Sequence, residues 1–329
     1  TWDERASWDT RSVQEKCVFT THTPVEAGHD RFTYDLVNRV MGEVIPTDLL
    51  KELGGKDELN MTMLALNLSH YVNGVAKKHG QVSQALFPGF EIHAIPNGLH
   101  PFTWGSPYMM ALFDKYLPGW AYEPELLVRV DNIPDLEIQD AHAGAKAYLF
   151  QYIEEITGAK FDPEILTIGF ARRATAYKRA NMIFNDAERL KKIGAGKLQL
   201  VFAGKAHPHD DYGKKMIQEI RNQADFFGDD LKIVYLPNYN MDVASRLIPG
   251  VDIWLNNPLR PLEASGTSGM KAALNGVPNF SVLDGWWIEG HIEGITGWSI
   301  GPPPTETTTD VNHSDEDVKD LYNKLEKTI

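Results

Sequence analysis

Short apolar runs alternate with amphipathic stretches from residue 166 onward, and this order constrains the fold more than any other feature of the sequence. The apolar runs predict buried strands at 166–170, 198–203, 232–236, 251–255 and 280–283. Helical spacing is found between them, at 178–193, 212–227 and 241–247. A β-α-β-α order predicts an α/β fold with a doubly wound parallel sheet, in which ligands bind beyond the carboxyl ends of the strands.

The first 95 residues lack this alternation and read as helices joined by loops. We predict that they form the incomplete end of an N-terminal domain. Helices are expected at 31–44 and at 61–78, where Leu64, Leu68, Val72 and Val75 recur at helical spacing. The passage 93–101 contains two prolines and a glycine and is the predicted interdomain hinge. Residues 96–300 are the predicted Rossmann-like catalytic domain, with a helix at 136–156, and 301–329 are a loop and a helix at 315–329.

Charge and composition exclude several classes of partner. The net charge of −13 repels nucleic acid and anionic membranes, so any phosphate must meet a local cationic pocket. No run of about 18 apolar residues is present, which argues against a membrane span. The single cysteine, Cys17, cannot form an internal disulfide and fits a reducing cytoplasm, where we expect the protein to act. The sequence leaves the oligomeric state open, a homo-oligomer included.

A cluster of cations follows the first predicted strand. Arg172, Arg173, Lys178 and Arg179 lie within eight residues, where the strand at 166–170 ends and the helix at 178–193 is expected to begin. Such a position supplies charge-assisted donors and a favourable helix dipole to an oxyanion, and the forked guanidinium suits phosphate. The alternative interpretation is a solvated basic turn.

A second loop, PLEASGTSGMK at 261–271, leads into a short apolar helix. Its glycines allow close approach of backbone amides, and Ser265, Thr267 and Ser268 add hydroxyl donors. We expect Lys271 in the first turn of this helix, where a desolvated amine can act as a neutral nucleophile and form a Schiff base. The alternative is an exposed helical lysine. The segment 207–211 lacks the ligand spacing of a metal site, and no metal is predicted.

Four stretches together resemble the α-glucan phosphorylase family, and specifically its shorter bacterial and archaeal branch. They are FTTHTPVEAGHD at 19–30, IPNG at 95–98, the cation cluster at 172–179 and EASGTSGMK at 263–271. The resemblance implies a GT-B-like glycosyltransferase fold whose C-terminal domain is the doubly wound sheet. It also implies that Lys271 carries pyridoxal 5′-phosphate as an imine. The implied reaction is reversible: inorganic phosphate cleaves the terminal unit of an α-1,4-glucan and releases glucose 1-phosphate.

The resemblance assigns roles on the phosphate side residue by residue. Arg172 and Lys178 match cations that hold the cofactor phosphate or the substrate phosphate, and Arg173 matches the substrate-phosphate arginine. In this family the cofactor phosphate exchanges a proton with the substrate phosphate, so cations are needed to offset their repulsion. The tyrosines matched near the phosphates are Tyr177 and Tyr239.

The sugar side is assigned in the same way. Gly266 and Thr267 match the loop that meets the cofactor and the sugar, while the residues matched to glucosyl binding are His22, Asn97, Glu263 and Ser265. His22 would also stabilise the oxocarbenium-like sugar. The resemblance therefore predicts His22, Arg173, Lys178 and Glu263 as the catalytic set.

The resemblance also limits what the chain is expected to do alone. Family members have a long first domain, and this chain begins near its end, so we expect a fragment with a half-assembled site unless another chain supplies the remainder. The regulatory features of the long animal and plant branch have no counterpart, which predicts the absence of allosteric and phosphorylation control. Two alternatives stay open: a nucleotide-sugar glycosyltransferase of the same architecture, and an inactive glucan-binding fragment.

Overall fold

The computed structural model describes residues 8–42, 44–304 and 314–328, which form two compact units. The first unit comprises the chain up to Asn97 together with Pro261–Ser265. The second comprises Gly98–Arg260 and the chain from Gly266 onward. The chain passes from the first unit to the second within the predicted hinge passage. That the first 95 residues are the end of an N-terminal domain on the glucan side of the site stays a prediction.

The second unit is built on a parallel sheet, which confirms the predicted fold class. Its strands within the described residues are β6 (Leu166–Ala171), β7 (Leu198–Ala203), β8 (Lys232–Leu236), β9 (Ile253–Asn256), β10 (Asn279–Val282) and β11 (Gly297–Ile300). They lie in the order β11-β10-β9-β6-β7-β8. This order reverses between β6 and β9, where Ile168 pairs with Ile253. Ligand sites in such sheets lie beyond the carboxyl ends of the strands at this switch point.

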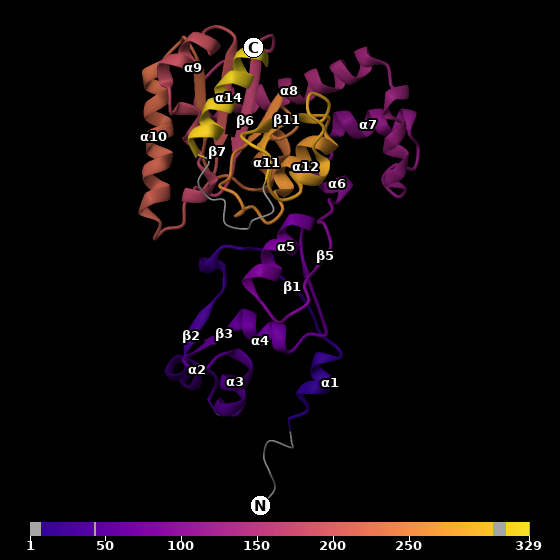
Figure 1. Ribbon diagram of the computed structural model, residues 1–329. Helices are drawn as coiled ribbons and strands as arrows, with labels where there is room; N and C mark the ends of the chain where they lie inside the picture. Colours follow the sequence, from indigo (N-terminus) through magenta and orange to yellow (C-terminus); the bar gives the residue numbers. More distant parts are fainter. Residues whose placement is uncertain (1–7, 43, 305–313, 329) are drawn as a thin grey trace, which may run out of the picture. The chain divides into compact units, whose positions relative to one another are not determined.

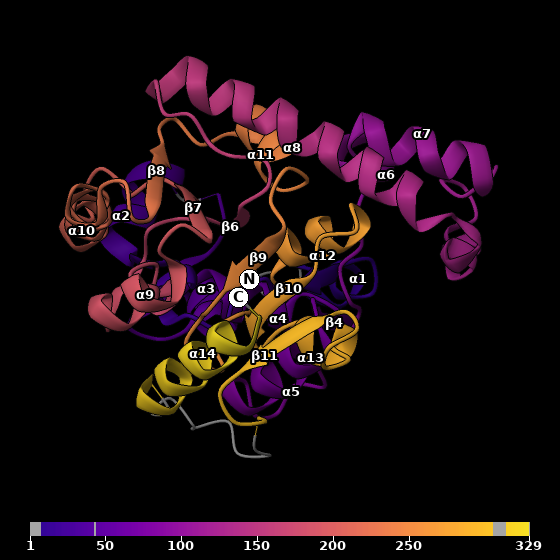
Figure 2. The same ribbon diagram turned by 90° about the horizontal axis from the view of Figure 1, so that it is seen from above.

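Helices cover both faces of the sheet (Figures 1 and 2). One layer holds α9 (Ala187–Gly194), α10 (Asp211–Phe227) and α14 (Ser314–Thr328), and the other holds α8 (Asp135–Thr157), α11 (Met241–Leu247) and α12 (Thr267–Leu274). Because both faces are buried, the strands read as continuous apolar runs instead of alternating ones. The two cores include Phe202, Ile220 and Leu321 on the first side and Leu149, Trp254 and Leu247 on the second.

Shorter elements complete the second unit. They are α6 (Pro101–Trp104), α7 (Pro107–Tyr116), the 3₁₀ helix Pro124–Asn132 and α13 (Trp287–Gly290). Helix α7 packs along α8 through a small apolar cluster that contains Phe113 and Trp120. Asp252 fixes α8 to the sheet, because its carboxylate accepts hydrogen bonds from His142 and Lys146, both at 2.8 Å, and from the Thr167 backbone at 2.7 Å.

The first unit has a small parallel sheet with the order β1-β4-β5 and an antiparallel pair, β2 and β3. Its strands are β1 (Val18–Thr20), β2 (Arg31–Thr33), β3 (Glu58–Asn60), β4 (Tyr71–Gly74) and β5 (His93–Ala94). Its helices are α1 (Thr10–Gln14), α2 (Tyr34–Met41), α3 (Thr47–Gly54), α4 (Met61–Asn67) and α5 (Lys77–Leu86). Among all described residues, no helix combines the length and the apolar composition needed to cross a membrane.

Three predicted helices were wrong in part. The helix predicted at 61–78 ends at Asn67, and Val72 lies in β4, where it pairs with Phe19 of β1. The stretch 31–44 starts as a strand, because Arg31–Thr33 pairs with Glu58–Asn60 before α2 begins. In both places pairing with a distant strand outweighs local helical periodicity.

The third wrong helix is the one predicted at 178–193. Arg179 adopts a left-handed conformation with φ 46°, and the α-helix begins only at Ala187, after Asp186 caps it by accepting a hydrogen bond from the Arg189 backbone. Strand β9 begins two residues later than predicted, and β10 begins one residue earlier. Strand β11 was not predicted. The helix predicted at 315–329 is confirmed as Ser314–Thr328, whereas residues 305–313 lie outside the described part of the chain.

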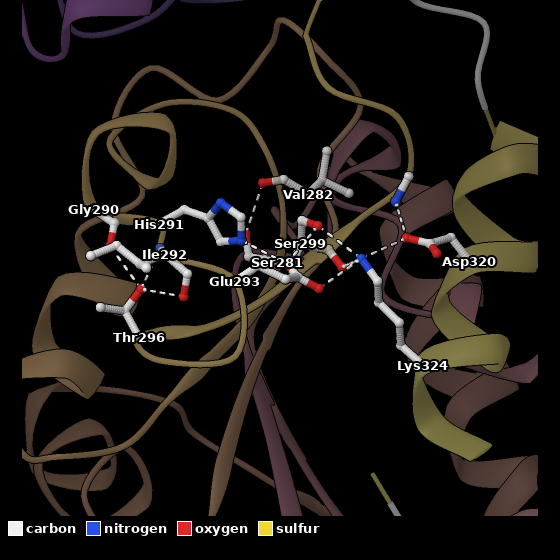
Figure 3. A network of polar contacts seen from close by, with 11 residues as sticks. Ser281, Val282, Gly290, His291, Ile292, Glu293, Thr296, Ser299, Asp320 and Lys324 are labelled. Carbon is white, nitrogen blue, oxygen red and sulfur yellow. Dashed lines mark hydrogen bonds and ion pairs between the residues drawn. The ribbon is translucent and has the colours of Figure 1, made fainter. Parts of the chain in front are cut away.

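A polar network docks α14 on the edge strand β11 (Figure 3). Lys324 donates to the carbonyl and the hydroxyl of Ser299, both at 2.8 Å, and lies 3.2 Å from the Glu293 carboxylate. Burial raises the pKa of Glu293, but hydrogen bonds from Ser299, His291 and Lys324 outweigh burial and lower the pKa to about 2. The charged form of Glu293 therefore stabilises this edge of the fold.

We predict that Glu293→Gln lowers the free energy of unfolding at neutral pH by roughly 1 kcal/mol. The full pKa shift would correspond to about 3 kcal/mol, but the carboxylate is 47% exposed, so solvent screens it. Because the pKa of Glu293 is lowered from 4.5 to about 2 on folding, its contribution is complete above pH 4.5 and is lost as the pH falls towards 2.

Urea unfolding at pH 7 and at pH 3 measures this difference. The control is Asp229→Asn, which removes an exposed carboxylate from the turn before β8. A Glu293→Gln deficit that is the same at both pH values would contradict the assignment.

Candidate functional site

The switch point of the large sheet carries the first part of the site. Arg172 directly follows β6, and its Nη1 donates a hydrogen bond to Oδ1 of Asn256, the last residue of β9. Arg172 and Lys178 are both buried, with 8% exposure, whereas Arg173 is exposed. The structure therefore corrects the alternative of a solvated basic turn. Of the four cations, Arg172 and Lys178 are buried, Arg179 is largely buried in an ion pair, and Arg173 faces solvent.

The loop after β7 supports this cation loop from the neighbouring strand. The Ala174 amide donates to the carbonyl of Lys205 at 3.0 Å, and the Arg172 amide donates to Ala203 at 3.2 Å. Gly204 has φ 158°, and a Cβ at this position would lie 2.1 Å from the Arg172 carbonyl oxygen. Only glycine permits so close an approach.

No α-helix starts directly after the cation loop, so the predicted helix dipole does not contribute here. The chain instead makes the 3₁₀ turn Ala176–Lys178 and reverses at Arg179. Tyr177 accepts a hydrogen bond from the Leu259 amide at 2.7 Å through its carbonyl, which ties the turn to the loop after β9. The Lys178 amine lies 5.3 Å from the centroid of the Tyr177 ring. Any affinity for anions at this turn comes from side-chain charge and hydrogen bonding.

Lys271 lies in the fifth position of α12, one turn later than predicted. Its amine is 3.5 Å from the centroid of the Trp104 ring on α6, and burial lowers its pKa. The alternative of an exposed helical lysine is therefore wrong. Helix α12 begins after Gly266, whose left-handed φ of 88° suits glycine, and Thr267 is its half-buried first residue.

Trp104 and Asn275 are residues that sequence reasoning missed. The Asn275 side-chain amide donates to the carbonyls of Trp104 and Lys271, both at 2.8 Å, and its Oδ1 accepts from the Ser106 amide at 2.6 Å. Asn275 thus holds the tryptophan ring against the lysine. Because 167 residues of sequence separate Trp104 from Lys271, no local pattern pointed to the pair.

Tyr239 follows β8 and is largely buried. Burial raises its pKa to about 12, while the charge of Arg172 acts in the opposite direction, so the two side chains are within electrostatic reach. The phenol therefore stays protonated and can donate a hydrogen bond near the cation loop. In the second unit the structure thus places Arg172, Lys178 and Tyr239 at the carboxyl edge.

Two predicted sugar-side residues lie beyond the carboxyl ends of strands in the first unit. His22 follows β1, and Asn97 follows β5, where its amide donates to the Val75 carbonyl at 3.1 Å. His79, which sequence reasoning missed, accepts a hydrogen bond from the Val75 amide at 3.1 Å. Burial is the main cause that lowers the pKa of His79 to about 4; a hydrogen bond with the Thr23 backbone partly opposes it, and His22 and His29 add smaller lowering effects. His79 is therefore neutral at pH 7.

Glu263 and Ser265 are buried and belong to the first unit, whereas Gly266 and Thr267 belong to the second. The predicted glucosyl-binding residues His22, Asn97, Glu263 and Ser265 are thus all in one unit. Every predicted cofactor residue, together with Arg173, is in the other.

The second unit fits a phosphate-bearing aldehyde such as pyridoxal phosphate. Its half-buried Lys271 lies over the ring of Trp104, and burial lowers the pKa of the lysine. The lowered pKa favours the neutral amine that imine formation requires. Near the buried cations, Thr175 Oγ1, Asn257 Oδ1 and Arg179 Nη1 are buried and have no hydrogen-bond partner among the described residues. A polar ligand would supply such partners. Within the same residues, no cluster of side chains suits a metal ion.

A cavity of about 930 Å³ lies elsewhere, along the edge strand β8. Its lining includes Lys205, Lys214, Arg221 and Tyr235, but neither Arg172, Lys178 nor Lys271. This cavity is therefore separate from the cation loop and from the lysine of α12.

Comparison with known proteins gives a family match and several similar relatives. The family model for carbohydrate phosphorylases matches residues 6–294. Maltodextrin phosphorylase of Thermococcus litoralis is 40% identical over 96% of this chain, and glycogen phosphorylase of Aquifex aeolicus is 37% identical over its whole length. Glycogen phosphorylase of Mycobacterium tuberculosis is 36% identical over 96% of it.

The chain spans about half the length of these curated relatives, since it covers 42%, 52% and 42% of them respectively. The family match, in contrast, extends over most of both units and includes all the predicted site residues. The chain belongs to the carbohydrate phosphorylase family.

Proposed function

We propose that this chain carries the cofactor and phosphate side, and part of the sugar side, of an α-glucan phosphorylase. The observation that carries the proposal is the arrangement in the second unit. Two buried cations lie at the switch point, and a half-buried lysine on α12 lies against Trp104. The relatives named maltodextrin and glycogen phosphorylase support a linear or branched α-1,4-glucan as the substrate. The chain has only about half of the relatives' length, so the activity is proposed for this chain together with the part that the relatives have in addition.

In the proposed site, Lys271 holds pyridoxal 5′-phosphate through its amine, with Trp104 as the apolar surface beside the attachment point. Arg172 and Lys178 bind the cofactor phosphate, and Tyr177, Tyr239, Gly266 and Thr267 line its surroundings. When bound, the cofactor supplies a phosphate group that can exchange a proton with the substrate phosphate. The burial of the two cations strengthens their interaction with both phosphates relative to water.

The remaining residues act on the substrates. Arg173 and Lys178 position inorganic phosphate, while His22, Asn97, Glu263 and Ser265 bind the glucosyl ring. In phosphorolysis, a phosphate oxygen forms a bond to the anomeric carbon as the glycosidic bond breaks, and the leaving glucan oxygen takes the proton that inorganic phosphate gives up. The products are glucose 1-phosphate and a glucan shortened by one unit. His22 stabilises the positive charge that develops on the sugar.

The first prediction concerns Lys271. Lys271→Ala should abolish covalent attachment of pyridoxal phosphate, because it removes the amine that lies 3.5 Å from the centroid of the Trp104 ring. Borohydride reduction followed by peptide mapping measures this directly, and Lys192→Ala, which removes an exposed lysine of α9, is the control. If the unmodified protein takes up no cofactor while a nucleotide sugar protects it against heat, the glycosyltransferase alternative replaces this proposal.

The second prediction separates the two phosphates. Arg173→Ala should weaken inorganic phosphate binding by ~1.5–3 kcal/mol, or roughly 10- to 150-fold, because one charge-assisted pair is lost. Cofactor attachment should be retained, since Arg173 is exposed whereas Arg172 and Lys178 are buried. Phosphate saturation curves and cofactor absorbance of the complete polypeptide measure the two effects.

Arg39→Ala is the matched control, because it removes an exposed arginine from α2. Equal loss of cofactor and phosphate binding in Arg173→Ala would contradict the separate roles. Glucan binding without any phosphate-dependent release of glucose 1-phosphate would favour an inactive fragment.

A further inference from the structure

Asp317, on α14, is one of the most deeply buried charged residues in the described chain, with 2% exposure. Its Oδ2 accepts a hydrogen bond from Arg179 at 2.7 Å, and its Oδ1 accepts from Arg260 at 2.5 Å. One carboxylate therefore holds two guanidinium groups that come from different loops. Removing one partner of such a buried group is strongly destabilising, because it leaves a charge uncompensated.

The two arginines hold the two loops that frame the switch point. Arg179 directly follows Lys178, and it donates to the carbonyls of Asn257 at 2.8 Å and Pro258 at 2.9 Å. The side-chain amide of Asn257 in turn donates a hydrogen bond to the Arg179 carbonyl at 2.8 Å. Arg260 lies in the loop that begins with Asn257 and runs to the start of α12. The loop after β6 and the loop after β9 are thus tied to each other and to one carboxylate.

We propose that Asp317 is a positioning residue for phosphate binding: by holding Arg179 and Arg260, it fixes the loop that carries Lys178 against the loop after β9. This inference rests on the proposed function, because it assigns Lys178 to the phosphates. Asp317 acts through other residues and has no direct contact with the substrate. Phosphate binding by two fixed cations depends on their spacing, and a displacement of about 1 Å can cost on the order of a hundredfold in rate.

The same helix offers a matched control. Lys324 also ties α14 to the sheet, but through Ser299 of β11 and through Glu293 (Figure 3), and not through Arg179 or Arg260. Lys324→Met should lower the melting temperature without changing the affinity for phosphate. Asp317→Asn should lower the melting temperature and also weaken phosphate binding.

The experiment measures two quantities on the complete polypeptide with its cofactor: the KM for inorganic phosphate, and the rise in melting temperature as phosphate is added. For Asp317→Asn, we expect the phosphate KM to rise roughly five-fold or more, and the phosphate-dependent stabilisation to shift to higher phosphate by the same factor. A purely structural role would reduce the yield of folded enzyme and its kcat per total protein, but would leave both phosphate readouts as in Lys324→Met.

A second variant decides the matter if Asp317→Asn does not fold. Arg179→Lys keeps a cation for Asp317, but the lysine lacks the fork that reaches Asp317 and two carbonyl groups at once. It should fold and show the same weakened phosphate binding. The inference is overturned if the folded variants, or Arg179→Lys alone, bind phosphate within about two-fold of Lys324→Met.

Failure of the proposed function looks different. In that case the unsubstituted protein itself forms no adduct with pyridoxal phosphate and shows no phosphate-dependent rise in melting temperature. An unsubstituted protein that holds the cofactor and binds phosphate, beside an Asp317→Asn variant that matches Lys324→Met, overturns only the positioning role.

Discussion

The parallel pairing of β6 with β9 is the interaction on which the rest of the second unit depends. This pairing makes the strand order reverse, and it places the first residues after both strands at the same edge of the sheet. Arg172 and Asn256 meet there through a hydrogen bond, although 84 residues separate them in the chain. A protein with a net charge of −13 can bind phosphate only where the fold concentrates cations in this way.

The sheet and most of its helices could be predicted because their signals are local. Strands that are buried on both faces read as apolar runs, and β6, β7 and β8 begin where the runs begin. The failures have a common cause. Val72 has the spacing of a helical residue, but β1 and β5 lie on either side of its strand, and this pairing decides its conformation. The helix predicted at 178–193 does not form at its start, because Arg179 adopts a left-handed conformation. In this conformation its side chain donates a hydrogen bond to the Asn257 carbonyl.

The candidate site was predictable where a short motif carries it and not where distant residues meet. Lys271, Gly266 and Arg172 were found from their loops. Trp104 and Asn275, which place the lysine amine on an aromatic ring, give no local signal, because their contacts form only when α6 packs near α12. The same is true of His79, which lies in α5, one residue beyond the end of the helix predicted at 61–78.

Gly301 shows how a buried contact can constrain a segment that the sequence presents only as a break. Its φ is 75°, and a Cβ at this position would lie 1.9 Å from Oδ1 of Asp317. Arg260 Nη2 would lie 3.1 Å from the same Cβ. Any larger residue would therefore push the carboxylate away from Arg260 as well as strain the backbone. The glycine that opens the passage Gly-Pro-Pro-Pro is thus needed for the buried ion pairs, and the prolines that follow end the strand beside them.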